Sequence, residues 1–129
     1  MGQGYTLGCE KCNYTIDYYQ GVGFLYPVEC NDMLEAMLAG KFGKRFKEIA
    51  TNAASPRVEF SREMYRCEKC GELRADFKIE LYDGDKVVLE KRHMCGKCRN
   101  KMSLVKSTRG LKCPHCKTKL KITHMINWD

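Results

Sequence analysis

The fold is decided by residues 67–98, which read CEKCGELRADFKIELYDGDKVVLEKRHMCGKC. A Cys-x-x-Cys pair stands at each end of this stretch, Cys67/Cys70 and Cys95/Cys98. Between them, residues 73–82 and 86–91 have the composition of two strands, and Asp83-Gly84 is a dipeptide typical of a hairpin turn. A hairpin folded at this turn brings the two cysteine pairs together at its open end. The stretch therefore predicts a β-hairpin that holds a metal ion.

The rest of the chain repeats this spacing. Cys9/Cys12 and Cys113/Cys116 are two further pairs, whereas the ninth cysteine, Cys30, stands alone. In a reducing compartment such pairs indicate metal ligands rather than disulfides. Zinc takes four thiolates in a tetrahedron, so eight paired cysteines predict two structural zinc ions, although a rubredoxin-like iron would use the same ligands. The predicted ligands are Cys9, Cys12, Cys67, Cys70, Cys95, Cys98, Cys113 and Cys116.

Two assignments of the pairs to the ions are open. A nested arrangement joins Cys67/Cys70 to Cys95/Cys98 through the hairpin and leaves the first pair to meet the last. A sequential arrangement joins neighbours, with Cys95/Cys98 and Cys113/Cys116 sharing an ion across residues 99–112. The turn at residues 83–84 favours the nested arrangement.

The residues around each pair predict how regular the cysteine turns are. The residue after the second cysteine often needs a positive φ, which Gly71 adopts freely and Asn13 tolerates. Arg99 and Lys117 do not fit that requirement, so the last two turns are expected to be less regular. His93 and His115, next to or inside a turn, are expected to be exposed neighbours of the sites and not ligands.

The predicted fold class is small α+β, with zinc-ribbon hairpins carrying rubredoxin-like knuckles and one main helix around residues 32–50. Asp32 and Glu35 match a capping box at its start. Gly40 and Gly43 interrupt its apolar pattern, so a straight helix and a helix broken near Gly40 are both open. Residues 21–27 are expected to form a loop. We expect a single domain over residues 1–129 with two zinc lobes, a helical insertion at about 31–52 and a ribbon hairpin at about 64–100.

Charge is unevenly distributed. The formal net charge is +7, of which residues 1–40 carry −4, residues 41–90 carry +1 and residues 91–129 carry +10. Two four-thiolate zinc sites, each formally −2, lower the total to +3. Neither a stretch of about 18 to 20 apolar residues nor a signal-peptide pattern is present, so a cytoplasmic location is expected.

No nucleotide-binding loop, metalloprotease motif or nucleophile elbow occurs, and closed four-ligand zinc sites leave no position for a substrate, so we expect no enzyme activity. The leading hypothesis is nucleic-acid binding through a basic C-terminal face. A protein-interaction adaptor is the alternative, and a thiol redox or metal-storage protein is a weaker one. The cations predicted to contact phosphates are Lys101, Lys106, Arg109, Lys112, Lys117, Lys119 and Lys121.

Several motifs resemble a group of small bacterial zinc-ribbon proteins. They are the opening Met1-Gly2-Gln3-Gly4-Tyr5, the Cys9–Cys12 knuckle, residues 21–27, and a Cys-Pro-x-Cys knuckle followed by a final Asn127-Trp128-Asp129. The resemblance implies metal sites and a bacterial, cytosolic setting, and transfers no activity because the group is functionally uncharacterised. The turns at Cys98 and Cys116 depart from the pattern, since they lack the glycine that commonly follows.

Overall fold

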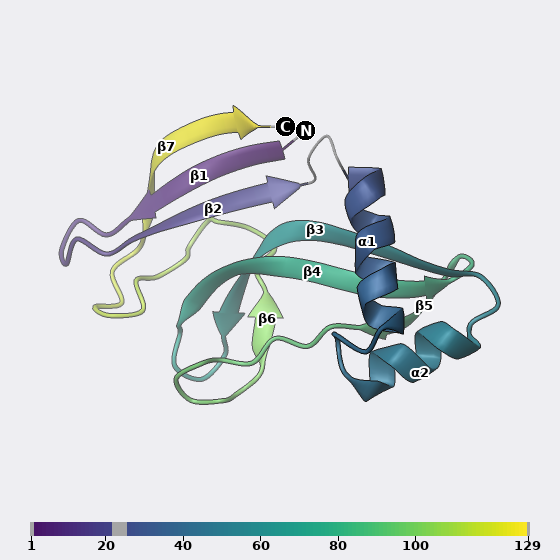
Figure 1. Ribbon diagram of the computed structural model, residues 1–129. Coiled ribbons are helices and arrows are strands. Elements are labelled where there is room, and N and C mark those ends of the chain that lie inside the picture. Colours follow the sequence, from purple (N-terminus) through teal and green to yellow (C-terminus); the bar gives the residue numbers. More distant parts are fainter. Residues whose placement is uncertain (1, 22–25, 129) are drawn as a thin grey trace. The chain divides into compact units, whose positions relative to one another are not determined.

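The computed structural model describes residues 2–21 and 26–128. Within these residues the protein is a small α+β structure of mostly antiparallel strands with two helices (Figure 1). The strands follow the order β5-β4-β3-β2-β1-β7, and β6 pairs with β3. The elements are β1 (Gly2–Gly8), β2 (Thr15–Gly21), α1 (Tyr26–Leu38), α2 (Lys44–Asn52), β3 (Pro56–Cys67), β4 (Leu73–Asp83), β5 (Lys86–Glu90), β6 (Met102–Leu104) and β7 (Lys121–Trp128).

Backbone contacts divide the chain into two compact units. Unit 1 holds all four cysteine pairs, and unit 2 holds both helices and the turn between β4 and β5. Strands β3 and β4 each contribute residues to both units. Unit 1 consists of Met1–Val22, Arg62–Phe77 and Arg92–Asp129, and unit 2 of Gly23–Ser61 and Lys78–Lys91.

In unit 1, β1 lies between β2 and β7 and pairs antiparallel with both (Figure 1). Tyr5 is opposite Tyr18 on one side and Met125 on the other. Alternation of side chains along β1 and β2 turns Leu7 and Tyr18 inward, where they are 1% and 3% exposed. The pairing of Gly2 with the far end of β7 joins segments more than 120 residues apart in sequence.

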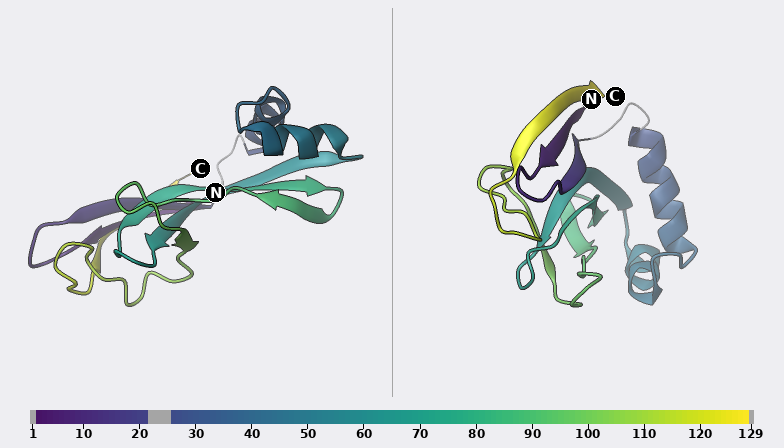
Figure 2. Two further views of the ribbon diagram at one scale, coloured as in Figure 1. Left: turned by 90° about the horizontal axis from the view of Figure 1, so that it is seen from below. Right: turned by 90° about the vertical axis from the view of Figure 1, so that its left-hand side faces the viewer.

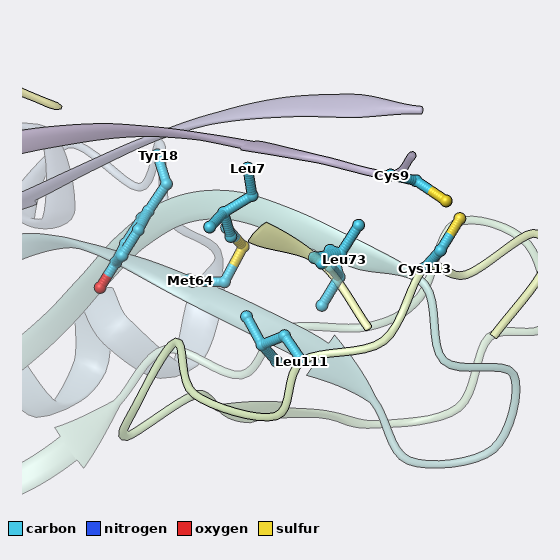
Figure 3. Packing of buried hydrophobic residues seen from close by; sticks show 8 residues of the cluster. Leu7, Cys9, Tyr18, Met64, Leu73, Leu111 and Cys113 are labelled. Atoms are coloured by element: carbon cyan, nitrogen blue, oxygen red, sulfur yellow. The ribbon is translucent and has the colours of Figure 1, made fainter. Parts of the chain in front are cut away.

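The core of unit 1 is assembled around the first and last cysteine pairs. Leu7 from β1, Met64 from β3 and Leu73 from β4 pack in one buried cluster with Cys9 and Cys113. Figure 3 shows the sulfur atoms of these two cysteines directed toward each other at one side of the cluster. The same cluster includes the buried residues Tyr18, Leu111 and Leu120.

A second buried cluster surrounds the ribbon cysteines and consists of Tyr65, Cys67, Cys95 and Met102. Strand β6 supplies Met102 and pairs antiparallel with the end of β3. Adjacent residues of β3 serve different clusters, because Met64 packs in the first and Tyr65 in the second. Strand β3 therefore carries apolar side chains into the surroundings of both cysteine groups.

In unit 2, α1 and α2 pack against one another (Figure 2). Helix α2 also contacts β5. The β4–β5 hairpin turns at Gly84, which has a φ of 63°. The prediction of strands on both sides of this turn is confirmed. No helix among the described residues is long and apolar enough to cross a membrane.

The predicted helix start at Asp32 is wrong, whereas the break near Gly40, one of the two expected alternatives, is present. Two helices are present, and Asp32 is an exposed residue inside α1 rather than its N-cap. Tyr26 and Pro27, expected in a loop, form the first turn of α1, because a proline there loses no intrahelical hydrogen bond. Gly40 and Gly43, with φ of 87° and 97°, separate the helices. Gly21, also expected in that loop, is the last residue of β2, and residues 22–25 lie outside the described residues.

Candidate metal centres

Each Cys-x-x-Cys pair is held by the same backbone turn. In every turn the amide of the first cysteine donates to the carbonyl five residues later, at 2.8 Å: Cys9 to Tyr14, Cys67 to Glu72, Cys95 to Asn100 and Cys113 to Thr118. In three of them the amide four residues on donates back to the first cysteine carbonyl. These bonds are local, so each turn positions its two sulfurs independently of the rest of the fold.

The expectation of less regular turns at Arg99 and Lys117 is wrong. Both residues adopt a positive φ, 60° and 65°, as Asn13 (60°) and Gly71 (80°) do in the first two turns. A non-glycine residue in this left-handed region costs about 1–2 kcal/mol. The third and fourth turns therefore keep the common geometry although Arg99 and Lys117 are unfavourable at a positive φ. Backbone strain of this kind is common at functional sites.

The eight sulfurs form two groups of four. Cys9, Cys12, Cys113 and Cys116 make one group and Cys67, Cys70, Cys95 and Cys98 the other, with all sulfurs of a group within 4.8 Å of one another. We call them the terminal site and the ribbon site. This grouping confirms the nested pairing. The ribbon site joins the ends of one hairpin, whereas the terminal site joins segments about 100 residues apart.

The sulfur spacing fits a single tetrahedral ion in each group. Four ligands at a Zn–S distance of about 2.3 Å have S···S edges of about 3.8 Å. The measured Sγ···Sγ distances are 3.3 Å for Cys9–Cys116 and Cys12–Cys113. In the ribbon site they are 3.3 Å for Cys67–Cys98, 3.6 Å for Cys70–Cys95 and 3.7 Å for Cys70–Cys98. The eight cysteines of the two groups form no disulfides, so both groups could hold a metal ion.

Burial repeats in the same way in all four pairs. The first cysteine is buried, with exposures of 6% for Cys9, 0% for Cys67, 2% for Cys95 and 0% for Cys113. The second cysteine is more exposed in each pair. Each site therefore has an apolar inner side that belongs to the core and an outer side near the surface. A metal ion held at such a site would connect the cysteine turns to the core.

Hydrogen bonds make two of the thiols easier to ionise. The Asn100 side chain and its backbone amide lower the pKa of Cys98 to about 6. The Thr118 side chain and backbone amide lower the pKa of Cys116 to about 6 in the same way. Metal binding needs thiolates, and these two ligands are thiolates near neutral pH without help from an ion.

The pKa values of Cys12 and Cys70 are instead raised. At Cys12 a hydrogen bond from the Tyr14 backbone favours the thiolate, but contact with the Cys113 sulfur and burial raise the pKa to about 12. At Cys70 the Glu72 backbone amide also favours the thiolate, yet burial and the neighbouring sulfurs raise the pKa to about 11. Four thiolates this close repel one another, so a divalent cation is needed to hold all four ionised.

The two histidines near the sites differ. His93 is buried, 4% exposed, against the prediction of an exposed residue. Its ring stacks on Tyr65 at 3.8 Å and its Nε2 lies 2.7 Å from the Phe77 carbonyl oxygen. His115 is exposed, as predicted, and contacts the Tyr14 ring edge-on. Neither belongs to a sulfur group.

The seven predicted phosphate-contacting cations are all exposed and all belong to unit 1. An isolated antiparallel bridge places Lys112 directly opposite Lys119. Lys117 donates from its Nζ to the Cys70 carbonyl oxygen, at 3.3 Å. Lys121 forms an ion pair with Glu10 at 3.0 Å. The structure thus gathers Lys112, Lys117 and Lys119 around the fourth knuckle.

Arg66 was missed by the sequence reasoning because it lies on β3, outside the basic C-terminal segment. Its guanidinium approaches the ribbon-site turn near Gly71, where Lys117 also lies. Strand alternation could have indicated its outward direction, since Tyr65 and Cys67 on either side are buried.

Comparisons with protein-family models, curated proteins and solved structures found no match to this chain. The resemblance to small bacterial zinc-ribbon proteins is thus supported only by the two cysteine groups themselves.

Proposed function

We propose that this chain is a non-enzymatic zinc protein in which two four-thiolate sites stabilise the fold. The observation that carries the proposal is the pair of sulfur groups, each with four free thiols at tetrahedral spacing. Thiolates are soft ligands that favour zinc, and four cysteines in each group, among the described residues, match the closed ligand set of a structural zinc ion.

Elemental analysis combined with native mass spectrometry tests this proposal. Two zinc ions per chain are expected. Cys113→Ser, which removes one terminal-site ligand, is expected to leave one tightly held ion, whereas Cys30→Ser is the matched control outside both sites and is expected to keep two. Iron in place of zinc, or two ions retained by Cys113→Ser, contradicts the proposal.

We further propose that unit 1 binds nucleic acid through its basic surface. Unit 1 holds 15 Lys and Arg against 7 Asp and Glu, a formal charge of +8, whereas unit 2 holds 8 against 9. Two zinc–thiolate sites reduce unit 1 to about +4. Positive charge therefore remains concentrated in the unit that carries the metals.

The specific observation in favour of a polyanion is the bridge between Lys112 and Lys119. Like charges directly opposite each other on paired strands are destabilising. Among the described residues neither lysine forms an ion pair with a carboxylate. A phosphate between the two ammonium groups offsets their repulsion.

Fluorescence anisotropy with a labelled 20-nucleotide single strand and the matching duplex tests this second proposal. Affinity is expected to fall steeply with salt, since each phosphate neutralised contributes about −0.7 to −0.9 to the slope of log K against log salt. An affinity that does not change with salt concentration contradicts phosphate binding. Capture of a protein partner that survives nuclease and high salt favours an adaptor instead.

A further inference from the structure

Two cations from distant parts of the chain meet over Gly71. Measured from the point where a Cβ on Gly71 would lie, Lys117 Nζ is at 3.2 Å and Arg66 Nη2 at 3.9 Å. Both side chains are exposed, and Gly71 beneath them is buried. Because glycine has no side chain, both cationic groups can lie within 4 Å of this point.

Among the described residues no carboxylate forms an ion pair with either cation. Glu72, the acidic residue next to Gly71, is held by Lys97 at 2.7 Å. Lys117 is instead fixed by its hydrogen bond to the Cys70 carbonyl oxygen, which positions its ammonium without neutralising it. Both cations are exposed, so an anion from solution can reach them.

We propose that Arg66 and Lys117 form a phosphate clamp, in which one phosphodiester group of a nucleic acid is bound by both side chains. Arginine offers two parallel donors to phosphate oxygens and lysine a point charge, so the two complement each other on one anion. The inference rests on the proposed nucleic-acid binding and names the residues that carry it.

The clamp and the Lys112/Lys119 bridge share one short segment. Lys117 is two residues before Lys119, so we expect a strand of nucleic acid bound by the clamp to contact the bridge with neighbouring phosphates. The clamp also links the two metal sites, since Lys117 follows Cys116 of the terminal site and contacts the ribbon-site turn. A nucleic acid bound here contacts the surface over both sites.

Anisotropy with the labelled 20-nucleotide strand, using the zinc-loaded full chain, tests the clamp. Arg66→Gln and Lys117→Gln are each expected to weaken binding about tenfold at low salt, as for charge-assisted bonds to phosphate. The fold-loss of affinity in the double variant is expected to be smaller than the product of the two single-variant losses, because both residues bind one anion. Lys69→Gln, which removes an exposed charge in the same turn as Gly71, is the matched control and is expected to change affinity less than twofold.

The outcomes separate the clamp from the broader proposal. If the parent protein binds neither strand nor duplex, both proposals fail. If the parent binds and the two variants bind equally well, or Lys69→Gln loses as much as they do, the clamp alone is overturned. If the variants lose zinc by native mass spectrometry while Lys117→Arg keeps it, the cations serve to neutralise the thiolate sites, which also overturns the clamp.

Discussion

Replacement of Arg99 by glycine is expected to stabilise the protein. Arg99 has a φ of 60° in the fourth position after Cys95, and an L-residue pays about 1–2 kcal/mol there. Glycine avoids that cost but loses about 0.5–1 kcal/mol through the greater freedom of the unfolded chain. The net gain is about 0.5–1 kcal/mol. Because the ribbon site forms only in the folded turn, zinc affinity is expected to rise about two- to fivefold.

The measurement is urea unfolding at fixed free zinc, together with zinc competition against a chromophoric chelator. Arg99→Ala is the control, since alanine removes the same side chain and keeps the unfavourable φ. Gly71→Ala is the reciprocal change in the same site and is expected to destabilise, because its φ is 80° and its Cβ would lie 3.2 Å from Lys117 Nζ. If Arg99→Gly is no more stable than Arg99→Ala, the strain argument is refuted.

Three further predictions concern the core and the thiols. Leu73→Ala is expected to lower the free energy of unfolding in urea by about 2–5 kcal/mol, because Leu73 is 5% exposed and packs beside the terminal site. Val87→Ala, at a 40% exposed residue, is expected to lower it far less. Equal losses of stability contradict the assigned core. In the metal-free protein at pH 8, iodoacetamide is expected to modify Cys98 before Cys70. A pKa of about 6 leaves Cys98 a thiolate above pH 6, whereas a pKa of about 11 keeps Cys70 protonated. Peptide mass mapping that finds equal rates of modification contradicts this order. Acidification is expected to release zinc from both sites as protons compete for the sulfurs, followed with a zinc-sensitive dye, and release that does not depend on pH between about 4 and 7 contradicts thiolate ligation.

Local features of the fold were predictable from the sequence, and features set by packing were not. The hairpin between residues 73 and 90 follows from strand composition and a two-residue turn signal, both of which act over a few residues. Asp32 and Glu35 satisfy a capping pattern and predict a start that is too late, because the helix begins six residues earlier at Tyr26, with Pro27 in its first turn. A capping box is a weak signal when the helix can be extended by residues that also suit its first turn.

The candidate sites show the same division. All eight sulfurs were predicted, since two cysteines separated by two residues converge through hydrogen bonds within one turn. The regular geometry of the third and fourth turns was not predicted, because arginine and lysine disfavour a positive φ. The hydrogen bonds common to all four turns nevertheless hold Arg99 and Lys117 at a positive φ. Burial of His93 depends on its stacking with Tyr65 from another strand, which no local pattern reveals.

By itself the sequence determined four cysteine turns that could bind metal and the basic character of the segment that holds two of them, because ligand spacing and charge are properties of neighbouring residues. Only the tertiary structure decided that the first pair meets the last, about 100 residues away, and that Arg66 joins Lys117 over Gly71. Both depend on the antiparallel pairing of β1 with β7 and on the path of β3, and such long-range pairings are selected by the burial of a shared core.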